Sequence, residues 1–448
     1  MDNRNDWENN KQPRAVAASR DIQGADPQVM ACLRRLIDAN GPLRFDTYME
    51  AVLYGEGGFY ASDTLRTGKT ADFVTSIELG PRFSWCVARA IQDWFVRTHA
   101  ESKTHAVSGV SEVRLVDIGG GGGKLARDVR DVWHAMWTGH FSAVHGAADA
   151  HVDPHVDAQA DPAFPVGSPT PTERSFSHSR AQVPSLTVAV VDTSPAARAA
   201  ARAEGLLAVA SWEELPFAGN VIVAHELFDN LPARLLYRGK QELRVGMDSS
   251  GVLQLYAAPL TKPLARFRAE WDLAGSRDAR LTSHGERAEG KRGVVPVPVG
   301  ACSWIAEATR RAVRPTFLLA VDYGDDVSRL ADREDWPVRA YQGQREVDPL
   351  DLVGKADVTC DVPVDVITRA LCDEGWDTRV FSQAAWLQKQ GIHEMDVALL
   401  REEQAAALAR QTMRQLQAKS VRNEIRALTD PAGFGGFVVW EASRAFLE

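Results

Sequence analysis

Short apolar runs alternate with amphipathic segments along most of this chain. Apolar residues at helical spacing predict helices at 27–40, 44–53 and 124–137, a helix that ends at residue 95 and a helix that begins at residue 195. Short runs of buried-type residues predict strands at 115–118, 186–191, 207–209, 220–224 and 316–321. Several strands end in an acid, and helices lie between them. This alternation predicts an α/β fold with a mostly parallel sheet.

Two stretches lack this periodicity. Residues 1–26 are polar and are predicted to form a disordered tail. Residues 139–184 are rich in Ala, His, Asp, Pro and Ser. Histidines gather there, but their spacing matches no tight set of metal ligands. A solvated, disordered insertion is therefore expected in place of a metal site.

The composition narrows the class of protein. A chain of 448 residues with 45% hydrophobic and 25% charged residues is typical of a globular protein with a large core. The net charge of -9 disfavours binding to the phosphate backbone of nucleic acids. The five cysteines are scattered and form no C-x-x-C, which indicates reduced thiols. No apolar run reaches the length of a membrane span and no targeting signal is evident, so a cytoplasmic location is expected.

A glycine turn, residues 119–123, joins a predicted strand to a predicted helix. A dinucleotide fingerprint fits only in the frame Gly121, Gly123, Ala126, which leaves extra glycines after the strand. The pattern acid-x-G-x-G-x-G fits directly off the strand. Its positions are Asp117, Gly119, Gly121 and Gly123. Many S-adenosylmethionine (SAM) methyltransferases begin this way, so the turn favours SAM, with a dinucleotide as the alternative.

Further cofactor contacts are expected after the next strands. Asp192 follows the strand at 186–191, where Rossmann-type proteins place an acid that accepts hydrogen bonds from ribose hydroxyls. The alternative is a surface acid that caps the next helix. Trp212 follows the strand at 207–209, near the expected position of an adenine ring.

The strand at 220–224 ends in a polar cluster that contains the candidate catalytic residues. The carboxyl end of such a strand is where open α/β sheets place their chemistry. Glu226 and Asp229 share a face if the turn is helical. His225 is placed to relay a proton. The structural alternatives are that Glu226 caps the turn and that His225 only supports the strand end.

Together the motifs resemble the MidA family of SAM-dependent methyltransferases. The matching segments span roughly residues 27–440 and comprise Gly41-Pro42, Tyr48-Met49, Gly58-Phe59-Tyr60, Asp72 to Ser76, the glycine turn, Asp192 to Pro195, Ala224 to Pro232, Asp322-Tyr323-Gly324, Tyr341 to Gln344, Val347 to Leu350, Gly354 to Thr359, Asp361-Val362, Gln383, Leu387 and Gly391-Ile392. The chain departs from the family at Ile77, where proline is usual, and at Gly120, which replaces the proline of Gly-Pro-Gly-x-Gly.

The resemblance implies a Rossmann-like class I methyltransferase fold with an N-terminal helical segment and additional substrate-side elements. The expected division is a tail at 1–26, a helical segment at 27–110 and a methyltransferase domain at 111–448. That domain would carry the insertion at 139–184 and a substrate-side insertion at about 237–315.

Mitochondrial members of the family methylate an arginine of a respiratory complex I subunit and support assembly of the complex. The resemblance therefore implies SAM as cofactor, with Ser76 at the cofactor side, and a protein arginine as acceptor. Glu226 and Asp229 would hold its guanidinium. The expected partner is a protein substrate of the complex I subunit type, with homodimerisation also expected. A non-catalytic assembly factor and an NAD-binding oxidoreductase remain as alternatives.

Overall fold

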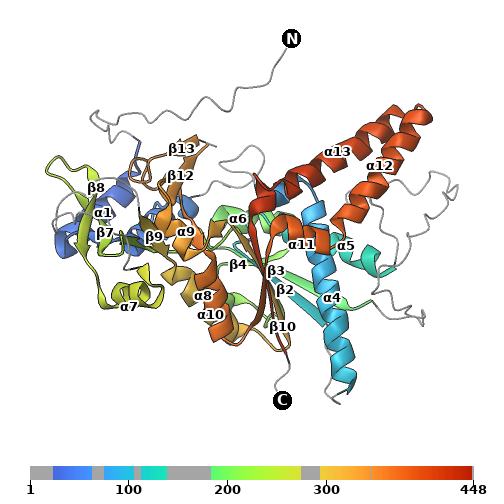
Figure 1. Cartoon of the computed structure of the whole chain (residues 1–448), viewed down its shortest axis with the longest axis horizontal. Helices are drawn as coiled ribbons and strands as arrows, with labels where there is room; N and C mark the ends of the chain where they lie inside the picture. Colours follow the sequence, from blue (N-terminus) through green and yellow to red (C-terminus); the bar gives the residue numbers. More distant parts are fainter. Residues whose placement is uncertain are drawn as a thin grey trace, which may run out of the picture.

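A computed structural model describes residues 24–62, 75–104, 112–138, 183–273, 293–343 and 345–445. Nearly all of the tail and of the insertion predicted at 139–184 lies outside these ranges. The described part contains a central seven-stranded sheet and a group of smaller, mostly antiparallel sheets (Figure 1).

The central sheet has six strands running in one direction and a single strand running against them. In spatial order it contains β16 (Asp377–Ser382), β17 (Val438–Arg444), β10 (Thr316–Asp322), β5 (Val221–His225), β2 (Glu112–Ile118), β3 (Ser185–Val191) and β4 (Leu207–Val209). The reversed strand is β17, which pairs antiparallel with both β10 and β16. The expected α/β fold is confirmed.

Successive residues of the central strands point to opposite faces of the sheet. Val221 and Val223 of β5 join one apolar cluster, whereas Ile222 and Ala224 join another. Both faces are therefore buried under helices, which explains the continuous apolar runs in these strands.

Helices from different parts of the chain cover the two faces. The first face is covered by α4 (Arg82–Thr104), α5 (Lys124–Thr138), α11 (Gln383–Lys389), α12 (Ile392–Leu408) and α13 (Thr412–Thr429). The second face is covered by α8 (Val299–Arg311) and α10 (Val364–Asp373). Beside α5, α6 (Pro195–Ala203) packs over β3 and β4. The hairpin of α12 and α13 extends away from the sheet (Figure 1).

A second core lies beside the carboxyl ends of the central strands. Its largest sheet is antiparallel and contains β1 (Leu43–Arg44), β7 (Gln241–Met247), β6 (Arg234–Tyr237), β9 (Val294–Val297) and β8 (Leu253–Pro259). Shorter sheets join β13 (Arg345–Val347) with β12 (Val338–Gln342) and β14 (Asp357–Cys360), and β11 (Gly324–Asp325) with β15 (Val362–Pro363). The helical elements around them are α1 (Pro27–Asn40), α2 (Phe45–Met49), the π-helix Glu50–Tyr54, the 3₁₀ turn Phe59–Ala61, α7 (Lys262–Glu270) and α9 (Val327–Asp332).

The expectation of a mostly parallel sheet is thus correct for the central sheet alone. Every strand pair of the second core is antiparallel except β11 with β15. The residues of the predicted N-terminal helical segment divide between the two cores. Residues 29–59 contribute to the second core, and residues 83–95 contribute to the first face of the central sheet. The domain boundaries expected from the sequence stay a prediction.

Within the described ranges, none of the helices combines the length and the apolar character that crossing a bilayer requires.

Candidate active site

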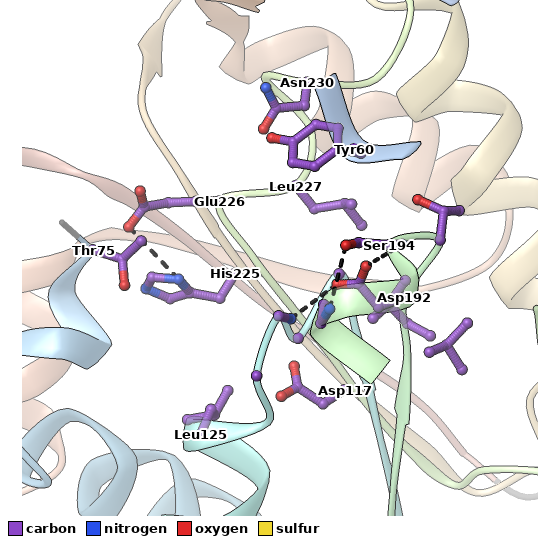
Figure 2. Close-up of a pocket in the computed structure, with 18 of the residues that line it drawn as sticks. Tyr60, Thr75, Asp117, Leu125, Asp192, Ser194, His225, Glu226, Leu227 and Asn230 are labelled. Atoms are coloured by element: carbon purple, nitrogen blue, oxygen red, sulfur yellow. Dashed lines mark hydrogen bonds and ion pairs between the residues drawn. The ribbon is translucent and has the colours of Figure 1, made fainter. Parts of the chain in front are cut away.

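A cavity of about 530 Å³ opens at the carboxyl ends of β2, β3 and β5. The chain runs from β2 outward to β3 and β4, but from β5 in the opposite direction to β10. Open α/β sheets bind ligands at such a reversal, because the two outgoing connections leave a crevice there. Figure 2 shows Asp117 and Asp192 at one side of this cavity and His225 with Glu226 at the other.

The glycine turn forms the floor of the cavity. Gly119, Gly121 and Gly123 have φ values of 67°, 54° and 76°. Residues with a Cβ rarely adopt such positive φ, and glycine does so without steric cost. These are the three glycine positions of the pattern acid-x-G-x-G-x-G, so the alternate spacing is the spacing at which the backbone needs glycine.

The three glycines meet different surroundings. Gly119 and Gly121 line the cavity. A Cβ on Gly123 would come within 2.5 Å of Leu206 Cδ1, in the apolar cluster between α5 and α6. Gly123 is therefore required for packing of the turn, and it does not reach the cavity.

Asp192 connects the end of β3 to the glycine turn. Its Oδ2 accepts a hydrogen bond from Gly121 N at 2.9 Å, and its Oδ1 accepts one from Ser194 N at 2.8 Å (Figure 2). The side chain lines the cavity, and burial raises its pKa. Each carboxylate oxygen keeps one lone pair for a ligand.

Asp117 lies beneath the turn and also lines the cavity. Burial, with the nearby charge of Asp192, raises its pKa to about 8. Its Oδ2 is buried without a hydrogen-bond partner among the described residues. A buried polar atom of this kind costs free energy unless a partner arrives.

Trp212, in the 3₁₀ turn Trp212–Glu214, lines the cavity beside Ser211. Trp304 of α8 lines it as well, and its indole N–H is buried without a partner within the described part of the chain. The sequence offered no signal for Trp304, because it lies in the middle of an amphipathic helix.

Glu226 forms the opposite side of the cavity. Its φ is 50°, an unusual value for a residue with a side chain, and its N–H donates to Val321 O at 2.7 Å. One carboxyl oxygen accepts from Ser76 N, and Oε1 is buried with no hydrogen-bond partner in the described ranges. Burial and the charge of Asp229 raise the pKa of Glu226 well above its usual value.

His225 lines the cavity next to Glu226 and contacts Ser76 behind it. Its Nε2 lies 2.8 Å from Ser76 Oγ, and its Nδ1 lies 3.6 Å from Glu226 Oε1. Burial lowers the pKa of His225 to about 3, so the imidazole is neutral near pH 7. Ser76 is fully buried and does not line the cavity.

Asp229 lies behind the cavity wall. No helix forms at 226–229, so the shared helical face expected for Glu226 and Asp229 is not present. Asp229 is buried close to Asp322 and accepts a hydrogen bond from the Tyr323 hydroxyl, and burial raises its pKa to about 6. It acts on Glu226 through its charge.

The structure brings further residues to this side of the cavity. The Tyr60 hydroxyl donates to Asp357 Oδ1 at 3.0 Å, and Asn230 Nδ2 donates to the same oxygen at 2.8 Å. The rings of Tyr54 and Tyr60 stack with centroids 5.6 Å apart, and both side chains line the cavity. From the sequence, this loop falls within the helical segment expected at 27–110, and Gly58-Phe59-Tyr60 enters only as part of the family resemblance.

We call one group of four acids the acidic end of the cavity: Glu226, which lines it, and Asp229, Asp322 and Asp357, which are buried behind its wall. The charge of Asp357 also raises the pKa of Glu226. The four acids come from three separate regions of the chain, which explains why the sequence motifs pointed to only two of them as catalytic candidates.

Over the described residues, no group of three or more His, Cys, Asp or Glu side chains could hold a metal ion.

Comparison with known proteins places this geometry in context. Residues 174–382 match the model of a family described as "Putative S-adenosyl-L-methionine-dependent methyltransferase". No curated protein matches the chain.

Two solved structures from Burkholderia thailandensis are similar over nearly the whole chain. One, described as a "likely methyl transferase" bound to S-adenosyl-homocysteine, has a TM-score of 0.65 at 23% identity and covers 93% of this chain and 92% of its own. The other, an uncharacterised protein, has a TM-score of 0.63 at 22% identity and covers 93% of this chain and 91% of its own. These findings are consistent with SAM as cofactor, and the chain has the α/β fold of SAM-dependent methyltransferases.

Proposed function

We propose that this protein is a SAM-dependent methyltransferase and that its acceptor is a protein arginine side chain. One observation carries the proposal: a single cavity joins the glycine turn to the acidic end. At each of these two places a carboxyl oxygen is buried without a partner among the described residues, on Asp117 and on Glu226.

The residues near the glycine turn fit SAM. Asp192 offers lone pairs to ribose hydroxyls, and Gly119 and Gly121 present backbone without a Cβ. Trp212 offers an aromatic surface to a base. SAM supplies an activated methyl group on a sulfonium, so the protein mainly has to position the acceptor and provide a suitable electrostatic setting.

The charge of the cavity favours cationic groups. Its lining contains four acids, Glu78, Asp117, Asp192 and Glu226. The one lysine of the lining, Lys124, is paired with Asp128 at 2.6 Å. A cation that enters would stabilise the ionised carboxylates and thereby offset the burial that raises their pKa values.

The acidic end fits a guanidinium better than an ammonium. A planar guanidinium presents parallel N–H donors that match a carboxylate in a two-pronged pair. Glu226 would hold it, Asp229 would add negative charge from behind, and the stacked rings of Tyr54 and Tyr60 would border it. The carboxylate would keep positive charge away from the attacking nitrogen and orient that nitrogen. His225, which is neutral, could take up or pass on a proton only transiently.

The resemblance to the MidA family adds the expectation that the acceptor belongs to a protein of the complex I subunit type. Homodimerisation belongs to the same proposal.

Two measurements test the proposal. Calorimetric titration with SAM and with NAD is expected to show binding of SAM only, and Asp192→Ala should weaken it by about 1–3 kcal/mol. Incubation with labelled SAM and lysate of the host is expected to label one protein on arginine.

Binding of neither ligand would favour a non-catalytic assembly factor, and binding of NAD alone would favour an oxidoreductase. Label on lysine or another residue would keep the methyltransferase and contradict the arginine.

A further inference from the structure

A chain of hydrogen bonds leads from the end of α13 to His225. Gln383 Nε2 donates to Leu428 O at 3.1 Å. Ser76 Oγ donates to Gln383 Oε1 at 3.3 Å, and it also contacts His225 Nε2 at 2.8 Å. Gln383 and Ser76 are fully buried, and the main-chain N–H of Gln383 donates to Phe437 O at 2.6 Å, so both the backbone and the side chain of Gln383 are held in place.

One assignment of donors and acceptors satisfies all of these groups at once. A main-chain carbonyl can only accept, so the Gln383 nitrogen must face Leu428 and its oxygen must face Ser76. A serine hydroxyl has a single hydrogen, and Gln383 Oε1 receives it. Ser76 Oγ can then only accept from His225, so the neutral ring carries its hydrogen on Nε2.

We propose that Gln383 is a positioning residue: through Ser76 it fixes the tautomer of His225 that carries hydrogen on Nε2 and presents the lone pair of Nδ1 to Glu226. Nδ1 lies 3.6 Å from Glu226 Oε1, which is longer than a hydrogen bond (Figure 2).

This tautomer keeps the Glu226 carboxylate available. If the hydrogen were on Nδ1, the ring would donate it to Glu226 Oε1, and a small rotation would close the gap. His225 would then occupy the oxygen that is buried without a partner in the described ranges. With the lone pair on Nδ1, an ionised Glu226 gains nothing from His225 and can turn this oxygen to a cationic group in the cavity. This role in the reaction rests on the proposed function, but the tautomer itself does not.

The test is nitrogen NMR of the ligand-free protein labelled with ¹⁵N in its histidine rings, with His225→Gln used to assign the signals. The shifts of protonated and unprotonated ring nitrogens are well separated. We expect His225 at pH 7 to show a protonated Nε2 and an unprotonated Nδ1. A protonated Nδ1, or a mixture of both forms, would overturn the proposal whether or not the protein transfers methyl groups.

Variants of Gln383 test its part in this arrangement. Gln383→Met removes both side-chain hydrogen bonds, and the tautomers should become mixed. Gln383→Glu can still accept from Ser76 and, when protonated, donate to Leu428 O, so Nε2–H should persist. Gln390→Met is the matched control, because Gln390 is also buried but caps the opposite end of the same helix, α11. If Gln383→Met does not fold, Ser76→Ala gives the same test.

Kinetics then separate positioning from a purely structural role. Gln383→Met should raise the KM for the acceptor by about tenfold, the effect expected when one charge-assisted hydrogen bond is lost, and leave SAM affinity unchanged. Gln383→Glu should restore most of the lost affinity. If the nitrogen NMR spectrum of Gln383→Met still shows only the Nε2–H tautomer of His225, Gln383 does not determine the tautomer.

Discussion

The cofactor side of the cavity is formed by the backbone of one continuous turn, whereas the acidic end is formed by side chains from regions far apart in the chain. At the turn, three glycines with positive φ and the hydrogen bond from Gly121 N to Asp192 set the shape. At the acidic end, Glu226 is repelled by Asp229 and Asp357, and Asp322 is repelled by Asp229 and Glu226. Tyr60 donates a hydrogen bond to Asp357, and Tyr323 donates one to Asp229. The shape of the first region depends on a backbone conformation that glycine adopts without steric cost, and the second region holds electrostatic repulsion that a bound cation would relieve.

This difference predicts that a single substitution in the turn removes most of the affinity for the cofactor. In Gly121→Val, the branched side chain meets a φ of 54°, and the backbone must shift away from the cavity. SAM binding should fall by more than about 100-fold, measured by calorimetry, since several contacts of the turn would be lost together.

Gly375→Val is the matched control. Gly375 has a φ of 79°, and a Cβ there would meet nothing within 4 Å. This variant should melt at a lower temperature but bind SAM normally. Equal loss of SAM affinity in both variants would mean that backbone strain alone, and not the position of the turn, causes the effect.

A single change at the acidic end should instead alter the rate. Glu226→Gln keeps the size of the side chain and removes its charge, so methyl transfer should slow by at least about tenfold at unchanged SAM affinity. Asp229→Asn should slow transfer less, because Asp229 lies behind the cavity wall. The double variant should cost less than the sum, since the two charges are coupled.

Transfer to the labelled acceptor, measured beside SAM binding, checks this expectation. Full activity in Glu226→Gln would remove the guanidinium contact from the mechanism. Reduced SAM affinity would reassign Glu226 to the cofactor side.

The repulsion stored at the acidic end should also appear as lost stability. Glu226→Gly removes a partly buried acid and places glycine at a φ of 50°. The free energy of unfolding should rise by about 1 kcal/mol from the backbone alone, while transfer to the acceptor is lost. Arg410→Gly, at an exposed residue with a φ of 55°, isolates the backbone contribution. Chemical denaturation of both variants makes the comparison, and a destabilised Glu226→Gly would show that this residue supports the fold.

The last prediction concerns Asp117 and pH. Its folded-state pKa of about 8 lies above the ordinary value of 3.8, so the unfolded chain releases this proton first as pH rises. The contribution of Asp117 to stability is therefore complete at low pH and is lost progressively between about pH 4 and pH 8. Asp117→Asn should flatten the fall in melting temperature between pH 5 and pH 8. Asp131→Asn, at a half-exposed acid of α5, should keep the wild-type slope. An unchanged slope in Asp117→Asn would place the titration elsewhere.

The same contrast explains what the sequence could predict. The helix at 27–40, the helix that starts at Lys124 and the strands of the parallel half of the sheet were predicted close to their observed bounds, because each has a local apolar period. The position of the glycine turn followed from the same local pattern. The roles assigned to its residues stay predictions.

The remaining elements depend on contacts that no local pattern reveals. Strand β16 is largely exposed and has no apolar run, and β17 is defined by pairing with β10 more than 110 residues earlier. The antiparallel sheet joins Leu43 to Val245 across about 200 residues. Likewise, Tyr60 and Asp357 come together through long-range packing. Both lie in segments that carried the family resemblance, but no local pattern around them indicated a place at the site.

The position of β17 also bears on how the chain is synthesised. This strand lies between β10 and β16, yet it is the last of the sheet to leave the ribosome. Until residues 438–444 emerge, β10 presents an unpaired edge and β16 has no partner in the sheet. Nascent chains would carry an apolar, aggregation-prone edge through the synthesis of more than 100 residues. A chaperone that covers this edge would have most effect in that interval.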